Sequence, residues 1–193
     1  MIYLDNAATS FPKPPMVVRA MAGTLQKLGG NPGRSGHALS LCGGRIIQRC
    51  RELLAEAFDA PAPENVIFFP SCTEALNTAI RGTLCEGDEV ICSHAEHNAV
   101  MRVLKGLEEQ GAIRVRMLAP NSLGLIAPEA LTAAITPRTA LCVICHASNV
   151  TGVVQPVQQL SRALKPYGVP LLVDAAQTAG ILDVSLSSLG ADM

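Results

Sequence analysis

The chain alternates between segments with helical periodicity and short runs of apolar residues. In the longer segments apolar residues recur at every third or fourth position, which is typical of amphipathic helices. The predicted helices cover residues 16–28, 38–58, 74–81, 98–110, 128–135 and 156–165. The apolar runs have the length of strands and cover residues 66–69, 89–92, 113–118, 141–145 and 170–174. Strands that alternate with helices predict an α/β fold, with three αβα layers around a mostly parallel sheet.

Two of the predicted strands differ in their pattern. In 113–118, Arg114 and Arg116 alternate with apolar residues, which indicates one solvated face and therefore a strand at the edge of the sheet. The run 141–145 is fully apolar and contains Cys142 and Cys145. Residues three apart in a strand point to opposite faces, so this CxxC spacing indicates core cysteines rather than a redox or zinc motif.

The amino-acid composition excludes several classes of protein. Hydrophobic residues make up 49% of the 193 residues and charged residues 16%, which excludes a disordered chain. Aromatic residues make up 3%, too few for a surface that stacks on single-stranded nucleic acid. The net charge of −1 provides no basic field for nucleic acid or anionic lipid. We therefore expect neither a nucleic-acid partner nor a membrane partner.

The sequence also predicts a cellular compartment. The first ten residues carry Asp5 and no basic start, unlike a signal peptide. The longest uncharged stretch, 139–161, contains polar residues and is not expected to span a membrane. Seven cysteines, an odd number, are scattered along the chain, as in proteins that keep free thiols in a reducing cytoplasm. We therefore expect a cytoplasmic protein.

Polar residues follow the predicted strands, at the sheet edge where parallel sheets bind ligands. Ser71 and Glu74, after the first strand, have capping-box spacing, so a helix should begin there. Its free N–H groups and the Thr73 hydroxyl could bind an anion, or Ser71 could be an ordinary N-cap. His97, after the second strand, could stack on a planar ligand or move protons, or it could cap the next helix.

Other strand ends carry an amide and a carboxylate. No metal site is expected at His94 and His97, because no Cys or carboxylate completes a set with recognisable spacing. Asn149 could present its amide to a bound carboxylate or phenolate, or belong to a polar turn. Asp174 follows a buried strand, where a carboxylate requires a cationic or donor partner. It could cap a turn, or hold a protonated ring nitrogen such as that of pyridoxal phosphate.

Six short segments occur in one order along the chain, at residues 3–9, 31–37, 73–75, 96–98, 148–152 and 174–177. Together they resemble the class V aminotransferase family of pyridoxal-phosphate enzymes, and within it the branch of cysteine desulfurases and selenocysteine lyases. The resemblance implies the large domain of a fold-type I transferase and pyridoxal 5'-phosphate as its cofactor.

The resemblance also implies roles for particular residues. Cys72 and Thr73 would hold the cofactor phosphate at the start of a helix, and Gln177 would contact the ring 3-oxygen. His97 would stack on the pyridine ring, and Asp174 would pair with its protonated nitrogen, so that these two are the catalytic residues. The implied substrate-binding residues are Asn6, Ala7, Ala8, Asn149, Arg34 and His37.

The implied reaction converts L-cysteine to L-alanine and transfers the sulfur to an enzyme cysteine as a persulfide. Selenocysteine is the alternative amino-acid substrate, and the complete enzyme would be a homodimer that serves a sulfur-acceptor protein. Two other interpretations stay open. One is another class V enzyme, either a transaminase or a β-lyase, and the other is a truncated, non-catalytic paralogue that acts as a binding or dimerisation module.

The chain departs from the family pattern at two places. Ser71 stands where the family usually has Gly. The family's Schiff-base lysine follows a Leu-Gly-Ala-Asp stretch, which here is 189–192. That lysine, the substrate-binding arginine and the persulfide cysteine are absent, so we expect an inactive N-terminal portion. Residues 1–15 would lie near the active site, and 16–193 would form a truncated cofactor domain in which 66–69 lacks its neighbouring strands.

Overall fold

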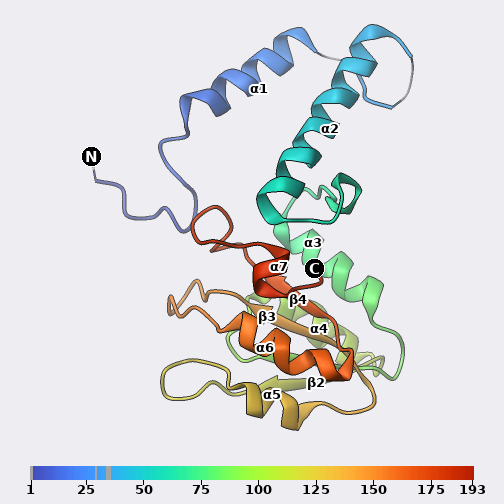
Figure 1. Ribbon diagram of the computed structural model, residues 1–193, viewed down its shortest axis with the longest axis vertical. Coiled ribbons are helices and arrows are strands. Elements are labelled where there is room, and N and C mark those ends of the chain that lie inside the picture. Colours follow the sequence, from blue (N-terminus) through green and yellow to red (C-terminus); the bar gives the residue numbers. More distant parts are fainter. Residues whose placement is uncertain (1, 29, 34–35) are drawn as a thin grey trace. The chain divides into compact units, whose positions relative to one another are not determined.

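The computed structural model describes residues 2–28, 30–33 and 36–193. The chain forms two compact units, Met1–Ile67 and Phe68–Met193. Figure 1 draws the first unit in blue to blue-green and the second from green to red. The sequence analysis divides the chain differently, with 1–15 near the active site and 16–193 as the cofactor domain. That division stays a prediction.

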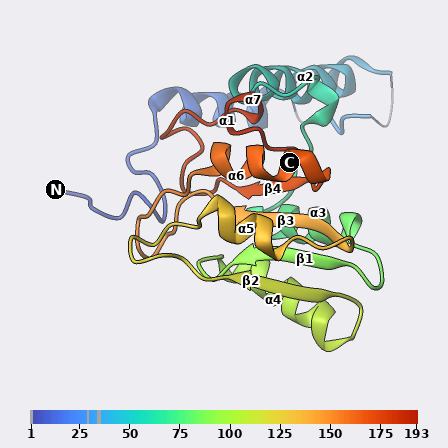
Figure 2. The same ribbon diagram turned by 60° about the horizontal axis from the view of Figure 1, so that its bottom comes forward.

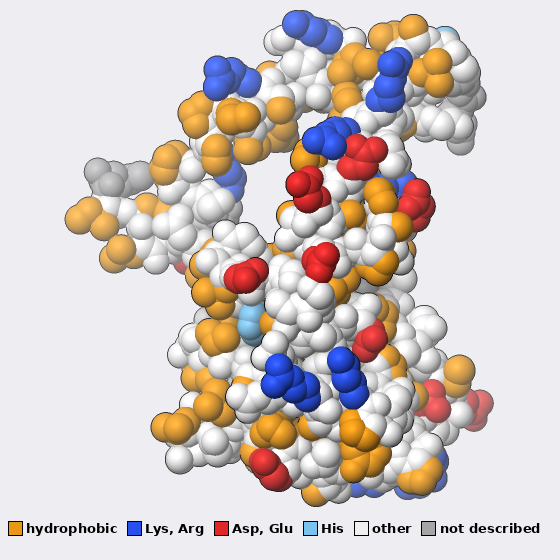
Figure 3. Space-filling view, viewed as in Figure 1, with side chains coloured by type: hydrophobic (Ala, Val, Ile, Leu, Met, Phe, Trp, Pro, Cys, Tyr) orange, Lys and Arg blue, Asp and Glu red, His pale blue; other side chains and the backbone are white. Residues whose placement is uncertain are grey.

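The first unit contains two helices. A proline stands in the first turn of α1 (Pro15–Lys27), where its missing N–H removes no helical hydrogen bond. α2 (Ala38–Phe58) begins at His37, whose Nδ1 accepts a hydrogen bond from the Ser40 N–H. A short 3-10 helix, η1 (Pro63–Asn65), follows. α1 buries none of its residues, and hydrophobic side chains gather on its surface (Figure 3).

The second unit is built on a four-stranded parallel sheet in the order β2-β1-β3-β4. Its strands are β1 (Glu89–Ser93), β2 (Arg114–Leu118), β3 (Thr139–Cys145) and β4 (Leu171–Asp174). Its helices are α3 (Cys72–Thr83), α4 (Asn98–Glu109), α5 (Pro128–Ala134), α6 (Val157–Leu164), η2 (Lys165–Tyr167) and α7 (Leu186–Leu189). β2 lies at one edge, which confirms the position predicted from its alternating arginines.

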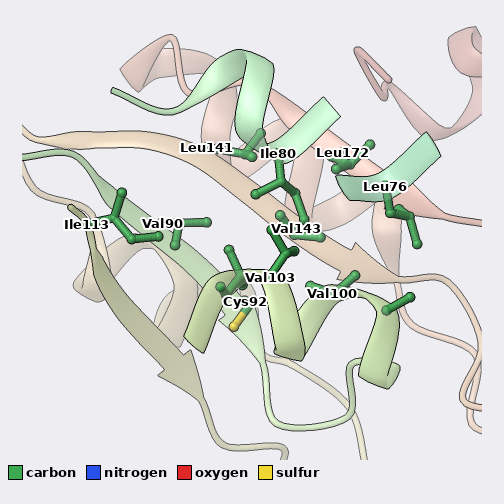
Figure 4. Packing of buried hydrophobic residues seen from close by; sticks show 12 residues of the cluster. Leu76, Ile80, Val90, Cys92, Val100, Val103, Ile113, Leu141, Val143 and Leu172 are labelled. Carbon is green, nitrogen blue, oxygen red and sulfur yellow. The ribbon is translucent and has the colours of Figure 1, made fainter. Parts of the chain in front are cut away.

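Helices cover both faces of this sheet (Figure 2). One buried cluster joins the sheet to α3 and α4, and it includes Ile80, Val90, Cys92, Val103, Leu104 and Val143 (Figure 4). A second cluster joins the opposite face to α5 and α6, and it includes Ile91, Leu131, Cys142, Ile144, Leu160 and Leu164. The two clusters confirm the predicted three αβα layers.

All six predicted helices and four of the five predicted strands are present, with ends within two residues of those expected. The strand predicted at 66–69 is wrong: within the described residues, no strand is assigned there. A strand exists through hydrogen bonds to a neighbour, and apolar residues alone do not create one. The side chains of Ile67, Phe68 and Phe69 are exposed by 68%, 46% and 36%, as expected for a segment without neighbouring strands.

The last residues of the chain run along β4. The Val173 N–H donates to the Met193 carbonyl at 2.9 Å, and the Met193 N–H donates to the Leu171 carbonyl at 3.2 Å. The Asp192 carboxylate accepts from the Leu171 N–H at 2.8 Å. The stretch 189–192 therefore leads the chain to the outer edge of β4.

A buried ion-pair cluster lies at the start of β1. The side chain of Glu89 is fully buried, and it accepts hydrogen bonds at 2.7 Å from both Arg116 and Arg138. The Thr136 hydroxyl donates to the same carboxylate at 2.9 Å. The hydrogen bonds from Arg116 and Thr136 lower the pKa of Glu89 from 4.5 to about 2, although burial acts in the opposite direction.

We expect this cluster to make the protein sensitive to acid. The pKa of Glu89 is lower in the folded state, so its stabilisation is present above about pH 4.5 and is lost as the pH falls toward about 2. Glu89→Gln should lower the unfolding midpoint by several degrees at pH 7 and by little near pH 2. Thermal unfolding scans at several pH values between 2 and 7 test this prediction, with Glu129→Gln, at an exposed site, as control. Wild-type and Glu89→Gln curves that stay parallel would contradict it.

Candidate functional site

A cavity of about 170 Å³ opens at the carboxyl ends of β3 and β4. Four chain segments contribute its walls: the start of α3, the start of α4, and the segments that follow β3 and β4. The lining residues are Cys72, Thr73, Leu76, His97, Ala99, Cys145, Ala147, Asn149, Asp174, Ala176 and Gln177. They include six of the residues that the sequence analysis assigned to a cofactor or substrate. His97 and Asp174, 77 positions apart in the chain, therefore face one common space.

Asp174 is the last residue of β4 and is 4% exposed. Its Oδ1 accepts hydrogen bonds from the Ala176 N–H at 3.0 Å and from the Cys72 thiol at 3.8 Å. The first of these contacts is the turn cap that the sequence analysis named as an alternative. Among the described residues no group hydrogen-bonds to Oδ2, so this oxygen is available to a ligand in the cavity.

Two cysteine thiols also line the cavity, and both are neutral at pH 7. Burial, and then the neighbouring Asp174 carboxylate, raise the pKa of Cys72 to about 11. Burial raises the pKa of Cys145 to about 12, and its thiol donates to the Ala147 carbonyl at 3.0 Å. Because the thiolate is the nucleophilic form, these cysteines act as hydrogen-bond donors.

Cys142 and Cys145 do not form a redox or metal pair. Cys142 belongs to the core cluster under α5 and α6, whereas Cys145 lines the cavity beside α3 and α4. The seven cysteines are all free. The opposite directions of the two side chains confirm the interpretation of the CxxC spacing. That Cys145 lines a cavity was not predicted from the sequence.

The N-terminus of α3 forms one wall of the cavity. Ser71 is its N-cap, and its hydroxyl accepts a hydrogen bond from the Glu74 N–H at 3.2 Å, as the sequence predicted. The first N–H groups of a helix have no partner within the helix and mark the positive end of its dipole. Thr73, in this first turn, lines the cavity. This wall therefore has the chemistry of an anion site.

His97 stands at the start of α4 on the wall of the same cavity. Its Nδ1 accepts a hydrogen bond from the Ala99 N–H at 3.1 Å. The capping alternative is thus confirmed, and capping and cavity lining occur together. Because Nδ1 is an acceptor, the neutral imidazole carries its proton on Nε2. The cap fixes the ring at the cavity wall.

Asn149 and Gln177 supply amides from the turns after β3 and β4, and both line the cavity. The turn that holds Asn149 is closed by the Ser148 hydroxyl, which accepts hydrogen bonds from the N–H groups of Val150 and Thr151 at 3.2 Å each. Within the described part of the chain, neither amide side chain is engaged in another hydrogen bond. Both can therefore bind a ligand.

The remaining predicted substrate residues belong to the first unit. Asn6, Ala7 and Ala8 lie in a turn in which the Asn6 Oδ1 accepts from the Phe11 N–H at 3.1 Å. His37 caps α2, and Arg34 lies outside the described residues. Their assignment to the substrate stays a prediction.

Among the described residues, no group of three or more His, Cys, Asp or Glu side chains has the arrangement of a metal site. No helix of that part of the chain combines the length and apolar character needed to cross a membrane.

Comparison with known proteins shows the family to which this chain belongs. Residues 2–193 match the family model described as Aminotransferase class-V. The chain belongs to this family. A probable cysteine desulfurase of Methanothermobacter thermautotrophicus is 33% identical over 192 residues, which cover 99% of this chain and 47% of that protein. A cysteine desulfurase of Nostoc sp. is 37% identical over 197 residues, which cover 100% and 48%. The chain thus spans about half the length of the curated relatives it matches.

Two solved structures share the fold of this chain. The structure of SspA in complex with cysteine superposes with a TM-score of 0.91 at 30% identity, covering 100% of this chain and 55% of that one. A NifS-like protein superposes with a TM-score of 0.91 at 28% identity, covering 99% and 53%. These matches confirm the predicted fold class and its correspondence to an N-terminal portion.

Proposed function

We propose that this chain is the cofactor-binding portion of a pyridoxal-phosphate-dependent cysteine desulfurase. The complete enzyme would convert L-cysteine to L-alanine and pass the sulfur to an enzyme cysteine as a persulfide. The observation that carries the proposal is the single cavity lined by Thr73, His97, Asn149, Asp174 and Gln177. The cysteine desulfurases among its relatives and the SspA structure with bound cysteine support the choice of substrate.

The residues of the cavity fit pyridoxal phosphate. The first turn of α3, with the Thr73 hydroxyl, would hold the phosphate dianion. The Asp174 Oδ2 would accept from the ring nitrogen and keep it protonated. His97 would lie against the ring, and Gln177 would donate to the ring 3-oxygen. The bound cofactor supplies an electron sink for charge that develops at the substrate α-carbon.

The polar groups of the cavity would also orient the substrate. The Asn149 amide would donate to the substrate carboxylate. Asn6, Ala7, Ala8, Arg34 and His37 remain the other proposed substrate-binding residues. The neutral thiols of Cys72 and Cys145 fit a site whose sulfur-accepting cysteine is located elsewhere. We further propose a cytoplasmic homodimer that delivers sulfur to an acceptor protein, as its seven free cysteines fit a reducing compartment.

A cofactor titration with a side-chain variant tests the phosphate wall. Thr73→Val should raise the Kd for pyridoxal phosphate roughly tenfold, because a hydrogen bond to a charged group is lost. Thr132→Val on α5, outside the cavity, is the matched control and should leave the Kd unchanged. Absorbance or fluorescence titration gives both values. A Thr73→Val protein that binds as tightly as wild type would overturn this assignment.

The reaction itself is tested on the complete protein with L-cysteine. Alanine and sulfide in equal amounts in the presence of a thiol reductant support the desulfurase. Formation of a keto acid instead would identify a transaminase or a β-lyase.

A further inference from the structure

The carboxyl group of Glu96 is buried next to the cavity but does not line it. Glu96 precedes α4 and is 9% exposed. Its Oε1 accepts hydrogen bonds from the Ser93 hydroxyl at 2.6 Å and from the Cys145 N–H at 2.9 Å. Its Oε2 is fully buried and has no hydrogen-bond partner among the described residues. A buried carboxylate oxygen without a partner is costly when charged, so this oxygen needs an explanation.

Glu96 connects two segments that form walls of the cavity. Ser93 is the last residue of β1, and its hydroxyl also accepts from the Ala95 N–H at 3.1 Å. These contacts close the loop that ends at His97. Cys145 is the last residue of β3, and the chain after it carries Asn149. The Glu96 carboxyl therefore holds the His97 loop against the end of β3.

Among the described residues, the titratable groups that interact electrostatically with Glu96 carry no positive charge. They are Cys92 of β1, Cys142 and Cys145 of β3, and Asp174 at the end of β4. The ion pairs of the described residues involve Glu52 and Glu89 instead. Burial raises the pKa of Glu96 from 4.5 to about 7, with a further rise from Asp174, although its hydrogen bonds from Ser93 and Cys145 act in the opposite direction.

We propose that Glu96 is a positioning residue that works as a neutral acid: its proton resides on the buried Oε2, and its Oε1 fixes the loop of His97 to the end of β3. In this state Asp174 is the one negative charge among the described residues that line the cavity, so the ring nitrogen of a ligand has one carboxylate partner. The link to the cofactor rests on the proposed function, whereas the protonation of Glu96 does not depend on it.

The protonation is tested without cofactor. An acid whose folded-state pKa is raised stabilises the fold below its unfolded pKa, and this stabilisation is lost as the pH rises through the folded pKa. Between about pH 4.5 and 7, the unfolding constant of wild type should therefore rise about tenfold per pH unit relative to Glu96→Gln. Glu109→Gln, at an exposed site, is the control and should follow wild type. A constant difference between wild type and Glu96→Gln would overturn the proposal.

Infrared spectroscopy gives a second measurement that needs no unfolding. A protonated carboxyl has a carbonyl stretch that a carboxylate lacks. We expect this band in the wild-type spectrum at pH 6 and its loss above about pH 7. The spectrum of Glu96→Gln should lack the band both at pH 6 and above pH 7. A wild-type spectrum without the band at pH 6 would contradict a neutral Glu96.

The positioning role is tested by cofactor titration at pH 6. Glu96→Gln keeps an oxygen that accepts from Ser93 and Cys145, so its Kd for pyridoxal phosphate should stay within a factor of about two of wild type. Glu96→Ala removes both contacts and should raise the Kd about tenfold. Equal affinity of both variants would overturn the positioning role. If wild type itself does not bind pyridoxal phosphate, the proposed function fails, and the stability and infrared experiments still decide the protonation.

Discussion

Replacing Asp174 with asparagine is expected to lower cysteine turnover by the complete enzyme roughly 100-fold or more. The amide can still accept the hydrogen bonds from the Ala176 N–H and the Cys72 thiol, so the fold should persist. It carries no negative charge, however, and cannot stabilise a protonated ring nitrogen in a buried site. Turnover of L-cysteine and the Kd for pyridoxal phosphate are the two measurements.

The matched control is Asp183→Asn, which removes an exposed carboxylate from the same unit and should leave both values unchanged. Retention of full turnover by Asp174→Asn would mean that Asp174 only caps the turn after β4. That result would remove the main support for a pyridine-type cofactor in the cavity.

Replacing Leu104 with alanine is expected to destabilise the protein by about 2–5 kcal/mol. Leu104 lies on α4, is fully buried, and belongs to the cluster that joins α3 and α4 to the sheet. The substitution loses apolar burial and leaves a cavity that the surrounding helices and strands cannot fully close. Because β1 and α4 also position His97, the cavity residues should lose order before the protein unfolds completely. Urea denaturation measures the change in the free energy of unfolding.

Leu123→Ala is the matched control, since the Leu123 side chain is 73% exposed. This variant should differ from wild type by no more than about 0.5 kcal/mol. A Leu104→Ala variant within that same range would show that the interface of α4 with the sheet adds little to stability.

Local pattern was enough to predict most of the helices and strands. The 3.6-residue period of 98–110 and the short apolar runs at 89–92 and 141–145 reflect which faces are buried, and burial of a face is already visible in the order of residues. Alternation of Arg114 and Arg116 gave the edge strand in the same way. The apolar residues of 66–69 satisfy the same pattern and predict a strand, but the segment has no pairing partner and forms none.

The predicted site followed from the position of polar residues rather than from periodicity. Asn149 and Asp174 come after buried strands, and parallel strands bring their carboxyl ends to one edge of a sheet. Ser71 caps α3 and His97 caps α4, as the capping interpretations predicted. His97 also lines the cavity, so the two interpretations of this residue hold together. Glu96 was part of a family motif with no role assigned, because burial of its carboxyl depends on the end of β3, 49 positions away in the chain.

The sequence by itself determined the alternation of helices and strands, the edge position of 113–118 and the family to which the chain belongs. Each of these depends on the spacing of residues within short segments, which can be read directly from the sequence. Only the tertiary structure decided that the side chains of Cys72, His97 and Asp174 share one cavity, that 66–69 forms no strand, and that Oε2 of Glu96 has no hydrogen-bond partner in the described part of the chain. Those properties depend on contacts between segments far apart in the chain, for which local spacing contains no information.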